Sequence, residues 1–107
     1  MSVFIVDTHV VKPEKQEEYM SFMRRVRKYM KENPETFKEV KSWKVFAQMF
    51  GGIAGGYVQL WEYDKMAHIE KSLTRMFKDK GFMEIKQQFN RLIEPATHSW
   101  NVWNTVT

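Results

Sequence analysis

The sequence predicts one ferredoxin-like α+β domain spanning residues 1–107, with the element order strand, helix, strand, strand, helical stretch, strand. Three observations predict it. β-Branched and aromatic residues dominate residues 2–11, 40–50, 57–63 and 97–107, and apolar residues recur at helical spacing in the two longer gaps between these segments. A glycine-rich turn separates the middle two strands. A chain of this length forms one modest core, and no linker or internal repeat divides it.

The first half of the chain is predicted to form a central strand, a helix and a second strand. Residues 2–11 lack Gly and Pro and carry apolar groups on both faces, which is typical of a central strand. Pro13 suits the first turn of the helix that follows, and Asn33-Pro34 ends it. Residues 40–50 then alternate with period two. The buried stripe of the helix consists of Tyr19, Phe22, Met23, Val26 and Met30.

The second half begins with a hairpin and continues into helices and a last strand. Four glycines within residues 51–56 favour a tight reversal. A phosphate-binding loop would need a helix directly after it, whereas strand 57–63 follows. Asp64 is the predicted N-cap of the helical region, Gly81 interrupts it and Pro95 ends it. Its apolar positions are Met66, Ile69, Leu73, Met76 and Phe77, then Phe82, Ile85, Phe89, Leu92 and Ile93.

Composition excludes several classes of site and partner. Without cysteine the chain has no disulfide, thiolate nucleophile or cysteine-ligated metal, as fits a reducing cytoplasm. The start of the chain lacks the basic segment of a signal peptide, and no apolar run approaches the roughly 20 residues of a membrane span. We therefore expect a cytoplasmic protein with no membrane partner.

The net charge of +4 does not indicate a nucleic-acid partner. It arises from 17 Lys and Arg against 13 Asp and Glu that are mixed along the chain. On a helix the densest basic cluster wraps around the exposed surface, which is typical of a solvated helix face. Its members are Arg24, Arg25, Arg27, Lys28 and Lys31.

A ferredoxin-like sheet is covered by helices on one face only, so its other face needs a partner. We expect Val58 and Leu60 to face the helices. The open face would then carry large aromatic and polar side chains, a pattern that marks an interface or a ligand site. We expect a homodimer through this face that encloses a cavity between the two sheets. The predicted open-face residues are Asp7, His9, Tyr57, Gln59, Trp61 and Tyr63.

Asp7 and His9 are the candidate catalytic residues. They lie two positions apart on one strand face, where a carboxylate can orient an imidazole for proton transfer. The alternative is a salt bridge at the rim. His98, at the start of the last strand, is expected near His9 as a ligand-binding residue. No close histidine spacing such as His-x-His occurs, so we expect no metal site.

Gln59, Trp61 and Tyr63 are candidate ligand-binding residues on the third strand. The two aromatic rings could stack on a flat ligand, and the amide of Gln59 could hydrogen-bond it. The alternative is that the aromatic side chains fill an interface between subunits.

The order of elements and several short segments resemble the antibiotic biosynthesis monooxygenase group of the dimeric α+β barrel superfamily. The segments are Lys12-Pro13-Glu14 after the first strand, the Gly-rich hairpin, and Leu60-Trp61-Glu62-Tyr63-Asp64 before a helix. The resemblance covers nearly the whole chain and implies a homodimer. Members include cofactor-independent oxygenases of aromatic substrates, haem-degrading enzymes and isomerases, so the fold does not select a reaction.

The haem-degrading branch fits poorly. Its members have an Asn near the end of the first strand, and a Trp and a His in the second helical region. By alignment these positions fall near Asp7, Glu70 and Gly81, and none of the three matches.

Together these features predict a monooxygenase-like protein that binds a small flat aromatic ligand in the barrel cavity and, if catalytic, needs no cofactor. The alternative is a non-catalytic ligand-binding or homo-oligomeric assembly module. A nucleic-acid binder ranks last, since only the high isoelectric point favours it.

Overall fold

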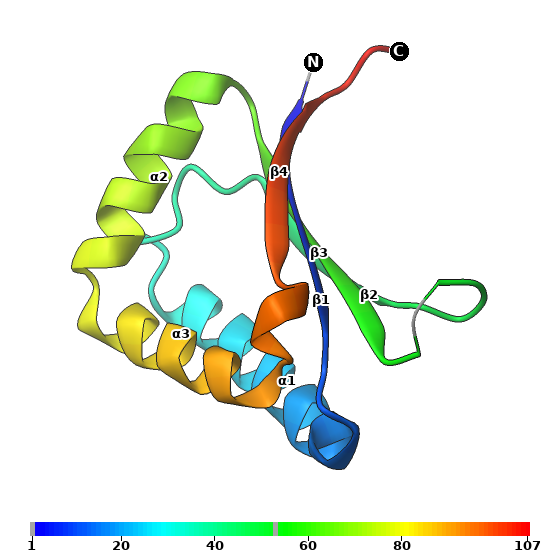
Figure 1. Cartoon of the computed structure of the whole chain (residues 1–107). Coiled ribbons are helices and arrows are strands. Elements are labelled where there is room, and N and C mark those ends of the chain that lie inside the picture. The colour runs from blue at the N-terminus through cyan, green and yellow to red at the C-terminus, as the bar shows by residue number, and fades with distance from the viewer. Residues whose placement is uncertain (1, 53) are drawn as a thin grey trace.

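The computed structural model describes residues 2–52 and 54–107, and shows a four-stranded antiparallel sheet with the helices on one side (Figure 1). The predicted ferredoxin-like α+β class is confirmed. No helix among these residues has the length and apolar character needed to cross a membrane. The strands are β1 (Val3–Val10), β2 (Ser42–Ala47), β3 (Gly56–Tyr63) and β4 (Ser99–Asn104); the helices are α1 (Gln16–Glu32), α2 (Met66–Lys78) and α3 (Lys80–Leu92). Short 3₁₀ helices at Pro13–Lys15 and Pro95–Thr97 precede α1 and β4.

The sheet order is β2-β3-β1-β4, so β1 is central, as its two apolar faces predicted. The second and fourth strands are shorter than the predicted 40–50 and 97–107. The amide of Gln48 donates to the carbonyl of Gly56 at 2.9 Å, after which the chain leaves the sheet. Gly51, Gly52 and Gly55 have φ angles of 72°, 59° and 82° in the loop that follows. These left-handed angles explain the glycines; Ile53, within the same predicted tip, lies outside the described residues.

The two faces of the sheet are the reverse of the prediction. Trp61 and Tyr63 are buried against the helices, whereas Val58 and Leu60 lie half-buried on the open face. The register places Asp7 beside Gln59 on the helix side. Polar groups are tolerated there because each finds a hydrogen-bond partner, which offsets the free-energy cost of burial. The alternation of residue types along the strands favoured aliphatic side chains for the core. It carries no information about the hydrogen-bond partners that polar side chains find there.

Asp64 does not cap the second helical region. The N-cap position of α2 is Lys65, and no side chain caps it. Asp64 instead forms an exposed ion pair with Lys41, 3.4 Å from carboxylate oxygen to amine.

The break between α2 and α3 lies at Asp79 rather than at Gly81. The Asp79 carboxylate caps α3 by accepting from the backbone amide of Phe82 at 3.1 Å. It also accepts from the hydroxyls of Tyr29 at 2.5 Å and Thr36 at 2.7 Å. Desolvation works to raise the pKa of Asp79, but these hydrogen bonds outweigh it and lower the pKa below its ordinary value. One carboxylate thus joins α1, the following loop and α3.

Replacing Gly81 by Ala is expected to lower the free energy of unfolding by about 1–3 kcal/mol. An added Cβ would collide with the hydroxyl of Tyr29 and lie 2.7 Å from its Cζ atom. Tyr29 cannot move aside without losing its bond to Asp79. Urea unfolding measures the change, with Lys80→Ala on the same turn as control. Equal stability of the two variants would contradict this packing.

Candidate functional site

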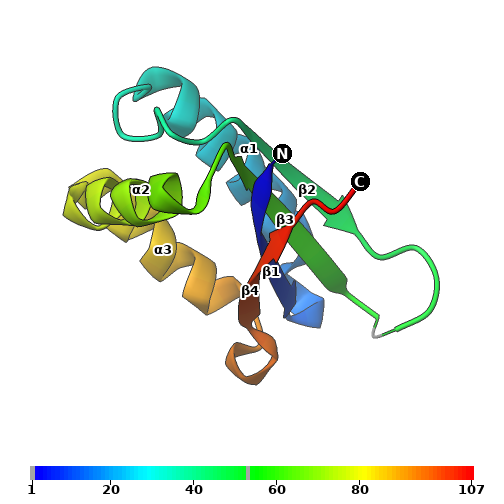
Figure 2. The ribbon, with the colours of Figure 1, turned by 90° about the horizontal axis from the view of Figure 1, so that it is seen from above.

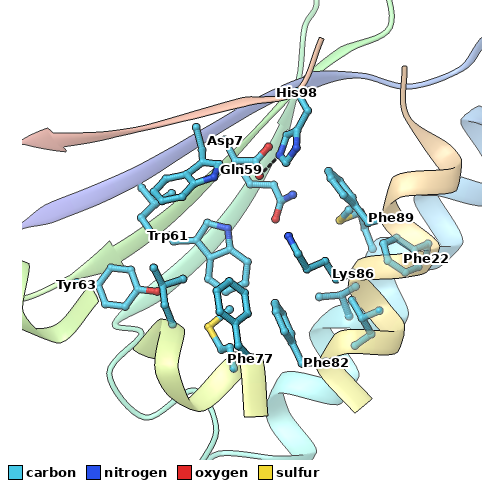
Figure 3. Close-up of a pocket in the computed structure, with 17 residues that line it drawn as sticks. Asp7, Phe22, Gln59, Trp61, Tyr63, Phe77, Phe82, Lys86, Phe89 and His98 are labelled. Atoms are coloured by element: carbon cyan, nitrogen blue, oxygen red, sulfur yellow. Dashed lines mark hydrogen bonds and ion pairs between the residues drawn. The ribbon is translucent and has the colours of Figure 1, made fainter. Parts of the chain in front are cut away.

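A cavity of about 130 Å³ lies between the helix-covered face of the sheet and the three helices (Figure 3). Its walls are largely aromatic and aliphatic, and its polar groups come from β1, β3, α3 and the residue before β4. Phe77 and Trp100 are both about half exposed at its rim. The lining residues are Ile5, Asp7, Phe22, Met23, Val26, Gln59, Trp61, Tyr63, Leu73, Met76, Phe77, Phe82, Ile85, Lys86, Phe89, His98 and Trp100.

Asp7 holds two histidines, one on each carboxylate oxygen. Its Oδ2 atom lies 2.9 Å from Nε2 of His98, and its Oδ1 atom lies 2.9 Å from Nδ1 of His9. The side chain of His98 is 24% exposed and lines the cavity, whereas that of His9 is fully buried behind Asp7. The pair that can meet a ligand is therefore Asp7 and His98.

Tyr19 fixes the proton arrangement of His9. The Tyr19 hydroxyl lies 2.6 Å from Nε2 of His9. Burial raises the pKa of Tyr19 far above its ordinary value, and the nearby charge of Asp7 raises it further. Tyr19 therefore stays protonated, and its hydroxyl donates a hydrogen bond to Nε2 of His9. The Nδ1–H group of His9 in turn donates a hydrogen bond to Asp7. His9 acts as a fixed donor that orients the carboxylate.

His98 is arranged as a proton acceptor. With Nε2–H donating to Asp7, the lone pair on Nδ1 is free, and Nδ1 has no hydrogen-bond partner within residues 2–52 and 54–107. The Asp7 carboxylate would stabilise the imidazolium that forms when Nδ1 takes a proton. An aspartate–histidine pair in an apolar cavity can thus act as a general base.

The Gln59 amide is oriented by Trp43. The indole Nε1–H of Trp43 donates to Oε1 of Gln59 at 3.0 Å, and an indole nitrogen can only donate. The carbonyl oxygen must therefore face Trp43, which turns the amide nitrogen toward the cavity. Figure 3 shows the end of this side chain directed into the pocket.

Tyr63 contributes its ring rather than its hydroxyl. The hydroxyl is hydrogen-bonded to Ser72 at 3.0 Å, and burial raises the pKa of Tyr63. Trp61 lies beside it and packs against Trp43, with ring centroids 5.8 Å apart. The rings of Trp61 and Tyr63 line the cavity on the sheet side, opposite α2 and α3.

The structure brings together all six predicted site residues, but not where the sequence placed them. We expected Asp7, His9 and Gln59 on the open face, between two subunits. They lie instead inside one protomer, under its own helices. His9 neighbours His98 as expected, with ring centroids 6.2 Å apart, but does not reach the cavity.

Sequence reasoning missed the contribution of α3. Lys86 lines the cavity, and Phe82 and Phe89 were assigned only to the helical stripe. Lys86 follows Ile85 of that stripe directly, which is the one signal that could have suggested it. No group of three or more acidic, histidine or cysteine residues in the described part of the chain is arranged to hold a metal ion.

The fold is similar to those of several solved structures of low sequence identity. A NIPSNAP family protein from Agrobacterium tumefaciens is 11% identical, with a TM-score of 0.77 over 99% of this chain and 94% of that one. SnoaB from Streptomyces nogalater, described as a cofactor-independent oxygenase, is 13% identical, with a TM-score of 0.71 over 99% and 94%. An antibiotic biosynthesis monooxygenase is 12% identical, with a TM-score of 0.69 over 98% and 99%.

The chain has the protomer fold of the dimeric α+β barrel proteins. The resemblance in element order and short segments is therefore confirmed at the level of fold. No protein-family model matches the chain, and no curated protein matches it at a significant level. At these sequence identities the similarity shows the fold alone and does not identify a reaction.

Proposed function

We propose that this protein binds a small flat aromatic ligand in the cavity of each protomer and oxygenates it without a cofactor. The observation that carries the proposal is the Asp7–His98 pair, held at 2.9 Å on the wall of a largely apolar cavity. Apolar walls bind a ring, and the polar pair meets its ionisable substituent. SnoaB, which has a similar fold, is described as a cofactor-independent oxygenase, so this fold is compatible with that class of reaction.

The proposed reaction starts from a hydroquinone. Nδ1 of His98 takes a phenolic proton, and the electron-rich anion reacts directly with dioxygen to form a C–O bond at a ring carbon. Loss of water then gives a hydroxyquinone, so that hydroquinone and O₂ become hydroxyquinone and H₂O. One oxygen atom becomes a substituent of the ring and the other leaves as water, while His98 returns its proton. The ligand itself supplies the electrons.

We also propose that a second copy of the chain covers the open sheet face. That face carries half-buried and exposed apolar groups in place of the predicted polar ones, and Trp103 on it is 60% exposed. The loop between β2 and β3 extends past the sheet on the side away from the helices (Figure 2). Met49 and Phe50 on this loop are 81% and 91% exposed. The apolar members of the face are Phe4, Val6, Phe46, Val58, Leu60 and Trp103.

This arrangement separates the two proposed roles. The open face would form the subunit interface, and the helix side would bind the ligand. A homo-oligomeric assembly role, given above as an alternative function, is therefore compatible with ligand binding.

Filling the cavity is expected to weaken ligand binding. Ile85→Trp adds a large ring at a partly buried cavity wall and should weaken the binding of single-ring hydroquinones at least about tenfold. Anaerobic calorimetry measures this, and oxygen consumption with ¹⁸O₂ incorporation into the quinone measures turnover. Phe46→Trp on the open face is the matched control. The proposal fails if wild-type protein binds no hydroquinone, or if Ile85→Trp binds it as well as Phe46→Trp does.

A further inference from the structure

The amide nitrogen of Gln59 is a hydrogen-bond donor that faces the cavity without a protein acceptor. The residue is 6% exposed, and Trp43 fixes its oxygen, so the Nε2 group faces the cavity. Within residues 2–52 and 54–107 that nitrogen donates to no oxygen. No side-chain polar atom that is itself buried lacks a partner among the described residues, so this nitrogen is open to the cavity, where a bound ligand can accept from it.

Lys86 is a second donor directed to the same place. It projects from α3 at the rim of the cavity, and Figure 3 shows its amine turned toward the amide of Gln59. The amine lies 5.7 Å from the ring centroid of Phe77. Lys86 forms no ion pair with any carboxylate of the described residues. Asp7, the one carboxylate on the cavity wall, is already held by two histidines.

The size of the cavity limits the ring system. A dry cavity of about 150 Å³ accepts a single benzene ring. The cavity here is about 130 Å³ and is partly open, with Phe77, Lys86 and Trp100 at its rim. We therefore expect one ring to fill it, with the ring substituents near the polar groups.

We propose that the ligand is a single-ring aromatic carboxylate. Its carboxylate oxygens accept from Nζ of Lys86 and Nε2 of Gln59, its ring packs against Trp61, and a ring hydroxyl meets His98. A carboxylate can accept from both donors at once, and the positive charge of Lys86 compensates the negative charge of the ligand. The inference rests on the proposed function and narrows the substrate class to a hydroquinone that bears a carboxylate.

The test compares 2,5-dihydroxybenzoate with 2,5-dihydroxybenzamide by calorimetry without oxygen, so that binding is measured apart from turnover. Wild-type protein should bind the acid about tenfold more tightly than the amide, the effect of one charge-assisted hydrogen bond in a partly open site. Lys86→Met should remove that preference by weakening the acid alone. Lys28→Met, at an exposed position of α1 outside the cavity, removes the same charge and should leave the preference intact.

Two results would overturn this inference while leaving the proposed function standing. In one, wild-type protein binds acid and amide equally well. In the other, Lys86→Met weakens both ligands to the same extent, which would make the lysine a wall of the cavity and not a charge partner. If neither compound nor an unsubstituted hydroquinone binds, the proposed function falls together with the inference.

Discussion

His98→Gln is expected to lower the rate of hydroquinone oxygenation about 100-fold or more, the range in which a general base contributes. Glutamine keeps a polar group beside Asp7 but has no basic nitrogen to take the phenolic proton. Because the side chain of His98 lies at the cavity wall and is 24% exposed, the fold should tolerate the change. Oxygen uptake and formation of ¹⁸O-labelled hydroxyquinone give the rate, and urea unfolding checks the stability.

The control for this experiment is His68→Gln. His68 lies on α2 and does not line the cavity, so the same substitution there should leave the rate unchanged. Asp7→Asn should reproduce the loss seen in His98→Gln, because it removes the carboxylate that stabilises the imidazolium. Normal turnover in both His98→Gln and Asp7→Asn would exclude the acid–base mechanism.

Leu60→Arg is expected to convert a dimer into monomers, weakening self-association at least about 100-fold. Leu60 lies near the middle of the open face, paired with Val6 on β1 and Lys44 on β2. A second copy packed on this face would bury two new guanidinium groups without partners. Sedimentation equilibrium measures the change across a range of protein concentrations.

Gln87→Arg provides the matched control, since it adds the same charge at an exposed position of α3 on the helix side. It should leave self-association unchanged. A wild-type protein that is monomeric at high concentration, or a Leu60→Arg variant as dimeric as wild type, would show that the open face has another role.

The order of the elements could be predicted because local signals agreed with the global fold. The alternation in residues 57–63, the stripe of α1 and the glycines of the hairpin each point to one element. Strand ends were less predictable, since only pairing partners decide them: β2 stops at Ala47 although apolar residues continue to Phe50. The α2–α3 break likewise depends on what Asp79 meets, namely Tyr29 and Thr36 from distant parts of the chain.

The candidate site was predicted by residue type but not by location. Period two shows which residues of a strand share a face, and it correctly grouped Asp7 with His9 and Gln59 with Trp61. It does not show which face the helices cover. That choice depended on buried partners such as Tyr19, which no strand pattern reveals. The role of Lys86 could not be predicted either, because it depends on the packing of α3 across the sheet.

The central claim is that the ligand lies under the helices of one protomer and not between two sheets. The side-chain NH signals of Gln59, Trp61 and Trp103 in a ¹H–¹⁵N spectrum test it most directly, during an anaerobic titration with a single-ring hydroquinone. Gln59 and Trp61 line the cavity, whereas Trp103 is on the open face. We predict that the signals of Gln59 and Trp61 shift in proportion to ligand bound while that of Trp103 stays in place. A shift of Trp103 with unchanged Gln59 and Trp61 would contradict the account.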